Sequence, residues 1–139
     1  VVDASKLSPR LGERWALPVE VIPFGWRTQQ SFLEKLGAMV DLRRDKSGIP
    51  FKTDQGNYIL DCHFGPIPAA SMLAQKLENR AGIVEHGLFL QMTTDLIVAG
   101  QNGIKRHTAP RRDFESRPRR KKPSNLAAAA FQTFSKGDP

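Results

Sequence analysis

The segment FKTDQGNYILDCHF, residues 51–64, decides the fold because a turn and the clearest strand of the chain follow each other in it. Gly56 and Asn57 tolerate positive φ, and polar side chains beside them can bond the nearby backbone, which predicts a turn. Residues 58–62 then carry aromatic and β-branched side chains in the pattern of a half-buried strand. The side chains predicted to share one face are Tyr58, Leu60 and Cys62, and those predicted on the other face are Ile59, Asp61 and His63.

Elements predicted on either side of this segment complete a βαββαβ order. Their apolar residues recur at helical or strand spacing, and Gly, Pro and polar clusters separate them. They are strand 17–23, helix 28–36, strand 39–43, helix 69–78 and strand 83–86. This order is typical of a ferredoxin-like arrangement, in which an antiparallel sheet carries both helices on one face. We therefore expect an α/β (α+β) fold with a ferredoxin-like domain over residues 17–86.

Single residues predict three details of these elements. Pro18 and Pro23 remove ladder donors from the first strand, so this strand should be short or lie at a sheet edge. Thr28 is a good N-cap for the first helix. The apolar face of the second helix is predicted to consist of Met72, Leu73 and Leu77, after Ala69 and Ala70.

Stretches outside this order are predicted to form a second sheet. Val1 and Val2 are typical of the end of a buried strand that runs into a polar loop, and we interpret them as the start of a truncated chain. Residues 87–90 and 95–100 are apolar runs without a partner among residues 17–86. All three stretches are therefore expected to belong to one further sheet.

The basic excess of the chain lies in its last quarter. The net charge is +7, yet residues 1–103 contain eleven basic and eleven acidic residues, whereas residues 104–139 contain ten and three. So many like charges with few apolar side chains cannot bury enough surface to offset the entropy of ordering. We therefore predict that residues 104–139 form a disordered basic tail, and the charge of the remaining chain indicates no nucleic-acid partner.

Composition also limits the compartment and the class of site. The apolar runs are far shorter than the roughly 18 residues that span a bilayer, and no signal peptide is visible, so a soluble, cytoplasmic protein without membrane contact is expected. Cys62 is the single cysteine of the chain, which fits a reducing compartment and excludes an internal disulfide. The three histidines lack metal-ligand spacing, so no metal site is predicted.

Lys6 is the candidate for contact with an anionic ligand. It follows the first predicted strand, and ligands of α/β proteins bind in the loops at strand ends. The alternative is a solvated loop lysine. Asp54 and Asp61 are explained by the turn and by an outward strand position, so they do not predict an acid–base pair. Trp15, near the first strand of the central sheet, is interpreted as a packing residue.

Six blocks of the sequence resemble type A ribose-5-phosphate isomerases, in order and almost without gaps. The blocks are VVDASKL (1–7), LPVEVIPFGW (17–26), LEKLG (33–37), PFKTDQGNYILDCHFGPI (50–67), IVEHGLFL (83–90) and DLIVAG (95–100). The resemblance covers residues 1–103 and corresponds to the C-terminal half of that family.

The resemblance implies an aldose–ketose isomerase that interconverts ribose 5-phosphate and ribulose 5-phosphate in the pentose phosphate pathway. No metal or organic cofactor is implied, because a carboxylate moves the proton through an enediolate. Lys6 is the one residue that matches a family substrate-binding position. The catalytic glutamate of the family lies outside this sequence, so the chain alone is expected to be inactive. Homodimers are usual in the family.

The family fold implies a division of the chain. A ferredoxin-like domain, residues 17–86, is inserted into the remnant of a Rossmann-like catalytic sheet, residues 1–16 and 87–103, and the tail covers 104–139. An alternative from another class of protein stays open. The chain could be a stand-alone ferredoxin-like binding or assembly module whose basic tail binds nucleic acid or another polyanion.

Overall fold

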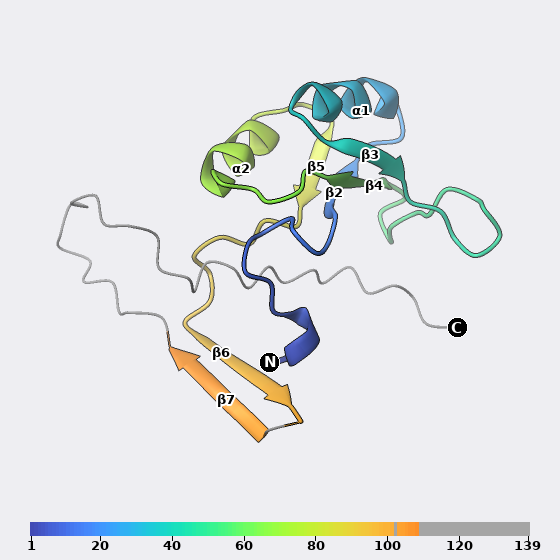
Figure 1. Ribbon diagram of the computed structural model, residues 1–139. Helices are drawn as coiled ribbons and strands as arrows, with labels where there is room; N and C mark the ends of the chain where they lie inside the picture. Colours follow the sequence, from blue (N-terminus) through green and yellow to red (C-terminus); the bar gives the residue numbers. More distant parts are fainter. Residues whose placement is uncertain (102, 109–139) are drawn as a thin grey trace.

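The computed structural model describes residues 1–101 and 103–108 of the chain, and it has a mixed α/β fold (Figure 1). Its strands are β1 (Val2–Asp3), β2 (Leu17–Val21), β3 (Met39–Leu42), β4 (Tyr58–His63), β5 (Ile83–His86), β6 (Asp95–Gly100) and β7 (Gly103–Thr108). Its helices are α1 (Trp26–Lys35), α2 (Ala70–Glu78) and the single 3-10 turn η1 (Ala4–Lys6). No helix in the described part of the chain is long and apolar enough to span a bilayer.

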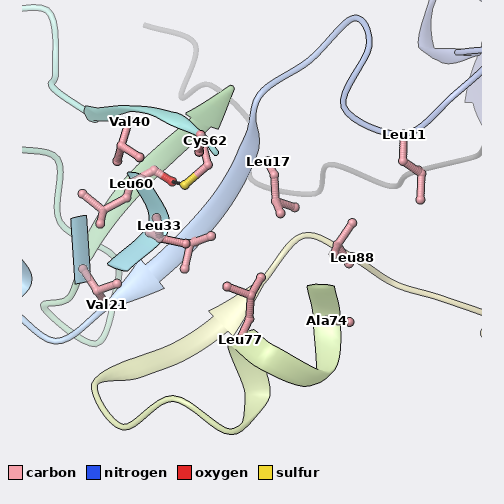
Figure 2. Close-up of a cluster of buried hydrophobic side chains, with 12 residues drawn as sticks. Leu11, Leu17, Val21, Leu33, Val40, Leu60, Cys62, Ala74, Leu77 and Leu88 are labelled. Atoms are coloured by element: carbon pink, nitrogen blue, oxygen red, sulfur yellow. Dashed lines mark hydrogen bonds between the residues drawn. The ribbon is translucent and has the colours of Figure 1, made fainter. Parts of the chain in front are cut away.

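Four strands form an antiparallel sheet in the order β3-β4-β2-β5, and this sheet carries both α-helices. Leu17 of β2 lies opposite Cys62 of β4, and this register continues to Val21 opposite Tyr58. Leu33 of α1 and Leu77 of α2 pack into one buried cluster with the sheet (Figure 2). Both helices therefore cover the same face, as the predicted element order requires.

The strand predicted at 58–62 is β4. Leu60 and Cys62 are fully buried in the core beneath the helices. Ile59 is fully buried as well, although alternation turns it to the opposite face, where it lies next to Glu20 of β2 in the pairing. The outer face of the sheet is therefore only partly open to solvent.

The first predicted strand is short, but it does not lie at an edge. β2 lies between β4 and β5, and its Pro18 is opposite Gly87, one residue beyond the end of β5. The carbonyl oxygen of Pro18 accepts a hydrogen bond from the Gly87 N–H at 3.0 Å. A Cβ on Gly87 would lie 2.9 Å from the proline ring, so the absence of a side chain there accommodates the ring. A proline fits this interior strand because the ladder ends beside it.

Both helix predictions need correction in detail. Gly25 rather than Thr28 is the N-cap of α1, and the Thr28 N–H bonds the Gly25 carbonyl oxygen inside the first turn. Met72 is 63% exposed, although it was expected on the apolar face of α2. The inward face of α2 repeats at i, i+3, i+4 and i+7, and Met72 lies off this stripe. The residues of the stripe are Ala70, Leu73, Ala74 and Leu77.

A second sheet has the order β1-β6-β7 and lies apart from the first in Figure 1. β1 is parallel to β6, with Val2 opposite Val98. Two of the three stretches predicted to share a further sheet, the first residues of the chain and residues 95–100, thus do so. Residues 87–90 do not belong to any strand; they are part of the linker between the sheets, and Leu88 packs into the main core.

The prediction of a disordered tail from residue 104 is wrong for its first residues. β7 extends to Thr108 and pairs with the whole of β6, from Gly100 opposite Gly103 to Asp95 opposite Thr108. The Asp95 carboxylate accepts hydrogen bonds from Arg106 Nε at 3.0 Å and from Thr108 Oγ1 at 2.7 Å. Backbone pairing and charge compensation therefore hold this basic strand. The rest of the predicted tail, residues 109–139, lies outside the described residues.

Candidate functional site

The carboxyl ends of β1 and β6 lie at the same edge of the second sheet, because these two strands are parallel. η1 follows β1 directly and contains Lys6, and Gly100 ends β6. The two strand ends are close together, since a Cβ on Gly100 would lie 3.2 Å from Ala4 Cβ. Ligands bind at this kind of edge in α/β proteins.

Local hydrogen bonds build the turn that carries Lys6. The Asp3 carboxylate caps it by accepting the Ser5 N–H at 2.8 Å, and the Leu7 N–H closes it on the Ala4 carbonyl oxygen. Hydrogen bonds from Ser5 hold the pKa of Asp3 below its ordinary value, and the positive charge of Lys6 acts in the same direction. The sequence ASK thus folds as a turn because an aspartate precedes it.

The ammonium group of Lys6 faces an indole ring. Lys6 is exposed, and its Nζ lies 5.0 Å from the centroid of the Trp15 ring. Among the described residues, Lys6 Nζ has neither an ion pair nor a hydrogen bond. The N–H donors of Lys6 are therefore available for an anionic ligand.

The other titratable side chains considered from the sequence do not gather at this edge. Asp61 forms a two-pronged ion pair with Arg43, with Arg43 Nε at 3.0 Å from Asp61 Oδ2. His63 lies 3.7 Å from Asp41 and belongs to the four-stranded sheet, like Asp61. No group of three or more His, Cys, Asp or Glu side chains in residues 1–101 and 103–108 could hold a metal ion.

Asp54 and Cys62 have structural roles. Asp54 is exposed in the turn before β4, as expected. Burial raises the pKa of the Cys62 thiol, because the low-polarity core disfavours the thiolate. Cys62 is therefore a core residue rather than a nucleophile.

Glu20 is a buried carboxylate that the sequence reasoning missed. It is 7% exposed in the middle of β2, and its Oε1 accepts hydrogen bonds from Thr53 Oγ1 at 2.8 Å and Asn57 Nδ2 at 3.0 Å. An acidic residue inside the apolar run LPVEVIP is the signal that could have revealed it. Its partners are the turn residues before β4, so it anchors that turn to the sheet.

Two surface depressions, of about 280 and 540 Å³, border the two α-helices. Apolar side chains such as Phe64, Ile67 and Leu73 line the first. Lys6 lines neither of them. The candidate site is therefore placed at the edge of the second sheet, where the carboxyl ends of β1 and β6 meet.

Comparison with known proteins identifies the family. Residues 1–103 match the family model of ribose 5-phosphate isomerase A (phosphoriboisomerase A). The chain therefore belongs to this family, and the resemblance drawn from its six sequence blocks is confirmed.

Curated relatives and solved structures agree with the family match. Ribose-5-phosphate isomerase A of Chloroflexus aurantiacus is 55% identical over 108 residues, which are 78% of this chain and 45% of that protein. The Synechococcus enzyme is 49% identical over 105 residues, 76% of this chain and 46% of that protein. The chain thus spans about half the length of the curated relatives it matches.

Two solved structures are similar in fold. A D-ribose-5-phosphate isomerase in complex with phospho-erythronic acid has a TM-score of 0.74 and 30% identity, covering 78% of this chain and 48% of the other. Ribose 5-phosphate isomerase A from Methanocaldococcus jannaschii has a TM-score of 0.71 and 36% identity with the same coverage. These structures support the mixed α/β fold with two sheets.

Proposed function

We propose that this chain is part of a ribose-5-phosphate isomerase and that Lys6 contacts its phosphorylated substrate. The reaction would interconvert ribose 5-phosphate and ribulose 5-phosphate, in the non-oxidative branch of the pentose phosphate pathway. The observation that carries the proposal is the Lys6 ammonium, exposed and without an ion pair at the carboxyl end of two parallel strands. A related enzyme in complex with a phosphorylated sugar acid supports this ligand class.

Lys6 would serve the reaction by electrostatics. The isomerisation moves a proton next to a carbonyl group, and negative charge develops on oxygen in the enediolate. A lysine offers a compact, mobile positive charge that can meet this oxygen or the phosphate group. The family resemblance puts the catalytic glutamate outside the matched segment. In this proposal the 139-residue chain therefore supplies binding but no proton acceptor.

The same proposal includes the division of the fold. Residues 17–86 would be a ferredoxin-like domain inserted into a Rossmann-like catalytic sheet, to which residues 1–16 and 87–103 contribute. The βαββαβ order and the sheet order β3-β4-β2-β5 support the first part, and the parallel pairing of β1 with β6 supports the second. A cytoplasmic homodimer is the quaternary state and location that the family suggests.

A hybrid enzyme tests the proposed activity. Residues 1–103 of this chain would replace the matching segment of the Chloroflexus aurantiacus enzyme, which is 55% identical over 108 residues. We expect the purified hybrid to convert ribose 5-phosphate to ribulose 5-phosphate, whereas the 139-residue chain alone should not exceed the uncatalysed rate. A folded hybrid without turnover, while the parent enzyme is active, would contradict the proposal.

A further inference from the structure

Lys6 has a flexible stem, and the described structure contains one direct restraint on its charged end. The Nζ atom lies over the ring of Trp15, 5.0 Å from the centroid. That distance is within the range in which the negative face of an aromatic ring attracts a cation. The contact joins η1 to the end of the linker before β2, because Lys6 and Trp15 are nine positions apart in the sequence.

The kind of group that Lys6 contacts determines whether its ammonium can still bind an anionic ligand. An ion pair would neutralise the ammonium and occupy its N–H donors. A ring face brings no counter-charge, so the positive charge stays available to a phosphate or an oxyanion. Asp3 is the nearest carboxylate in the sequence, but its hydrogen bonds go to Ser5, and it forms no ion pair with Lys6 among the described residues.

Hydrogen bonds and packing fix the linker just before Trp15. Arg14 Nη1 donates to the Leu7 carbonyl oxygen at 2.9 Å, which closes the linker into a loop just before Trp15. Leu11 inside this loop is buried in the main core, and its carbonyl oxygen accepts the Ile67 N–H at 2.8 Å. Trp15 itself is 47% exposed, so burial in the core does not by itself explain why a tryptophan stands at this position. The indole therefore follows a loop that is anchored to the main core and to the segment between β4 and α2.

We propose that Trp15 is a positioning residue for substrate binding, which orients the Lys6 ammonium toward the phosphorylated substrate. This inference rests on the proposed function and adds a residue that neither the family match nor the sequence reasoning assigns to it. Trp15 restrains the charged end of Lys6 before the ligand arrives, so less side-chain freedom is lost on binding. Loss of the Trp15–Lys6 contact should therefore weaken substrate affinity and leave the rate of the chemical step unchanged.

The ring contact can be tested in the 139-residue chain without any activity measurement. In a proton NMR spectrum, ring currents should shift the ε-methylene signals of Lys6 upfield of those of the other lysines. The shift should disappear in Trp15→Leu and persist in Trp15→Phe. Phe24→Leu, which removes an exposed ring from the loop before α1, is the control and should leave the Lys6 signals unchanged. Identical Lys6 signals in Trp15→Leu and the parent chain would overturn the inference.

The hybrid enzyme tests the consequence. Trp15→Leu should raise KM about two- to fivefold at unchanged kcat and thermal midpoint, as expected from an exposed cation–π contact, and Trp15→Phe should restore most of the affinity. In the Lys6→Ala background, Trp15→Leu should have no further effect. An unchanged KM in Trp15→Leu, or the same loss with and without Lys6, would overturn the inference. If Lys6→Ala itself changes nothing, the proposed function fails instead.

Discussion

Glu20 connects the central strand β2 with the turn that precedes β4. Thr53 and Asn57 both donate to its Oε1, across 33 and 37 residues of sequence. The turn itself was predictable from Gly56 and its polar neighbours, since those preferences are local. The hydrogen bonds from this turn to Glu20 were not predictable. A polar side chain of the turn can bond the nearby backbone or a distant carboxylate, and the pairing of the strands in the folded sheet determines which bond forms.

Replacing Glu20 by alanine should therefore destabilise the fold. The change leaves the side-chain donors of Thr53 and Asn57 without their acceptor, and hydrogen bonds to a charged group contribute about 1.5–3 kcal/mol. Urea unfolding of Glu20→Ala should show a free energy of unfolding that is lower by about 2 kcal/mol. Glu85→Ala is the matched control, because Glu85 is exposed and lies opposite Glu20 in the sheet. A loss of equal size in both variants would contradict the role given to Glu20.

At the scale of elements, the linker over residues 7–16 shows why one glycine is required. Gly12 has a φ of +77°, and a Cβ there would collide with the backbone carbonyl oxygen of Gly65 and lie 2.9 Å from the Ile67 side chain. Gly48 has a φ of +79°, but a Cβ there would meet nothing within 4 Å. An alanine at either position would thus have a strained backbone, but only the alanine at position 12 would also clash with neighbouring atoms.

Gly12→Ala and Gly48→Ala should separate these two costs. The left-handed conformation alone costs a non-glycine residue roughly 1–2 kcal/mol, which is the loss expected for Gly48→Ala. Gly12→Ala should lose more than about 3 kcal/mol, since the backbone of residue 65 must also move. Thermal and urea unfolding of both variants would measure the difference. Equal losses would contradict the close packing of the linker against residues 65–67.

β7, the strand that completes a hairpin with β6, is the element that sequence reasoning missed. Composition predicted disorder from residue 104, because charge runs usually stay solvated. The pairing became possible because β6 offers a complete partner strand and Asp95 offers a charge for Arg106. Neither condition can be read from the composition of the basic segment.

Asp95 gives this hairpin a pH dependence. Hydrogen bonds from Arg106 and Thr108 hold the pKa of Asp95 below its ordinary value. Because the pKa of Asp95 is lowered in the folded state, its carboxylate stabilises the hairpin at pH values above its pKa in the unfolded chain. This stabilisation is lost as the pH falls through the pKa in the folded state. In an NMR titration, Asp95 should titrate below the ordinary range, and Thr108→Val and Arg106→Ala should each raise its midpoint. An Asp95 midpoint unaffected by both changes would contradict the hydrogen bonds from Arg106 and Thr108.

At the scale of the whole molecule, two linkers join the sheets. Residues 7–16 and 87–94 connect them, and each linker buries a leucine, Leu11 and Leu88, in the main core (Figure 2). The element order was predictable because helix and strand periodicity is local. The pairing of β1 with β6 joins residues 96 positions apart. The sequence predicted that these stretches share a further sheet, but periodicity could not give their parallel register. The family resemblance added what composition and spacing could not, namely a substrate class for Lys6.

The central claim is that Lys6 contacts the sugar phosphate, and Lys6→Ala in the hybrid enzyme tests it most directly. Loss of a hydrogen bond to a charged group should lower kcat/KM about 10- to 100-fold at an unchanged thermal midpoint. Lys46→Ala, which removes an exposed lysine from the turn after β3, should leave both values unchanged. Equal kcat/KM for Lys6→Ala and the unmodified hybrid, at equal stability, would contradict the account.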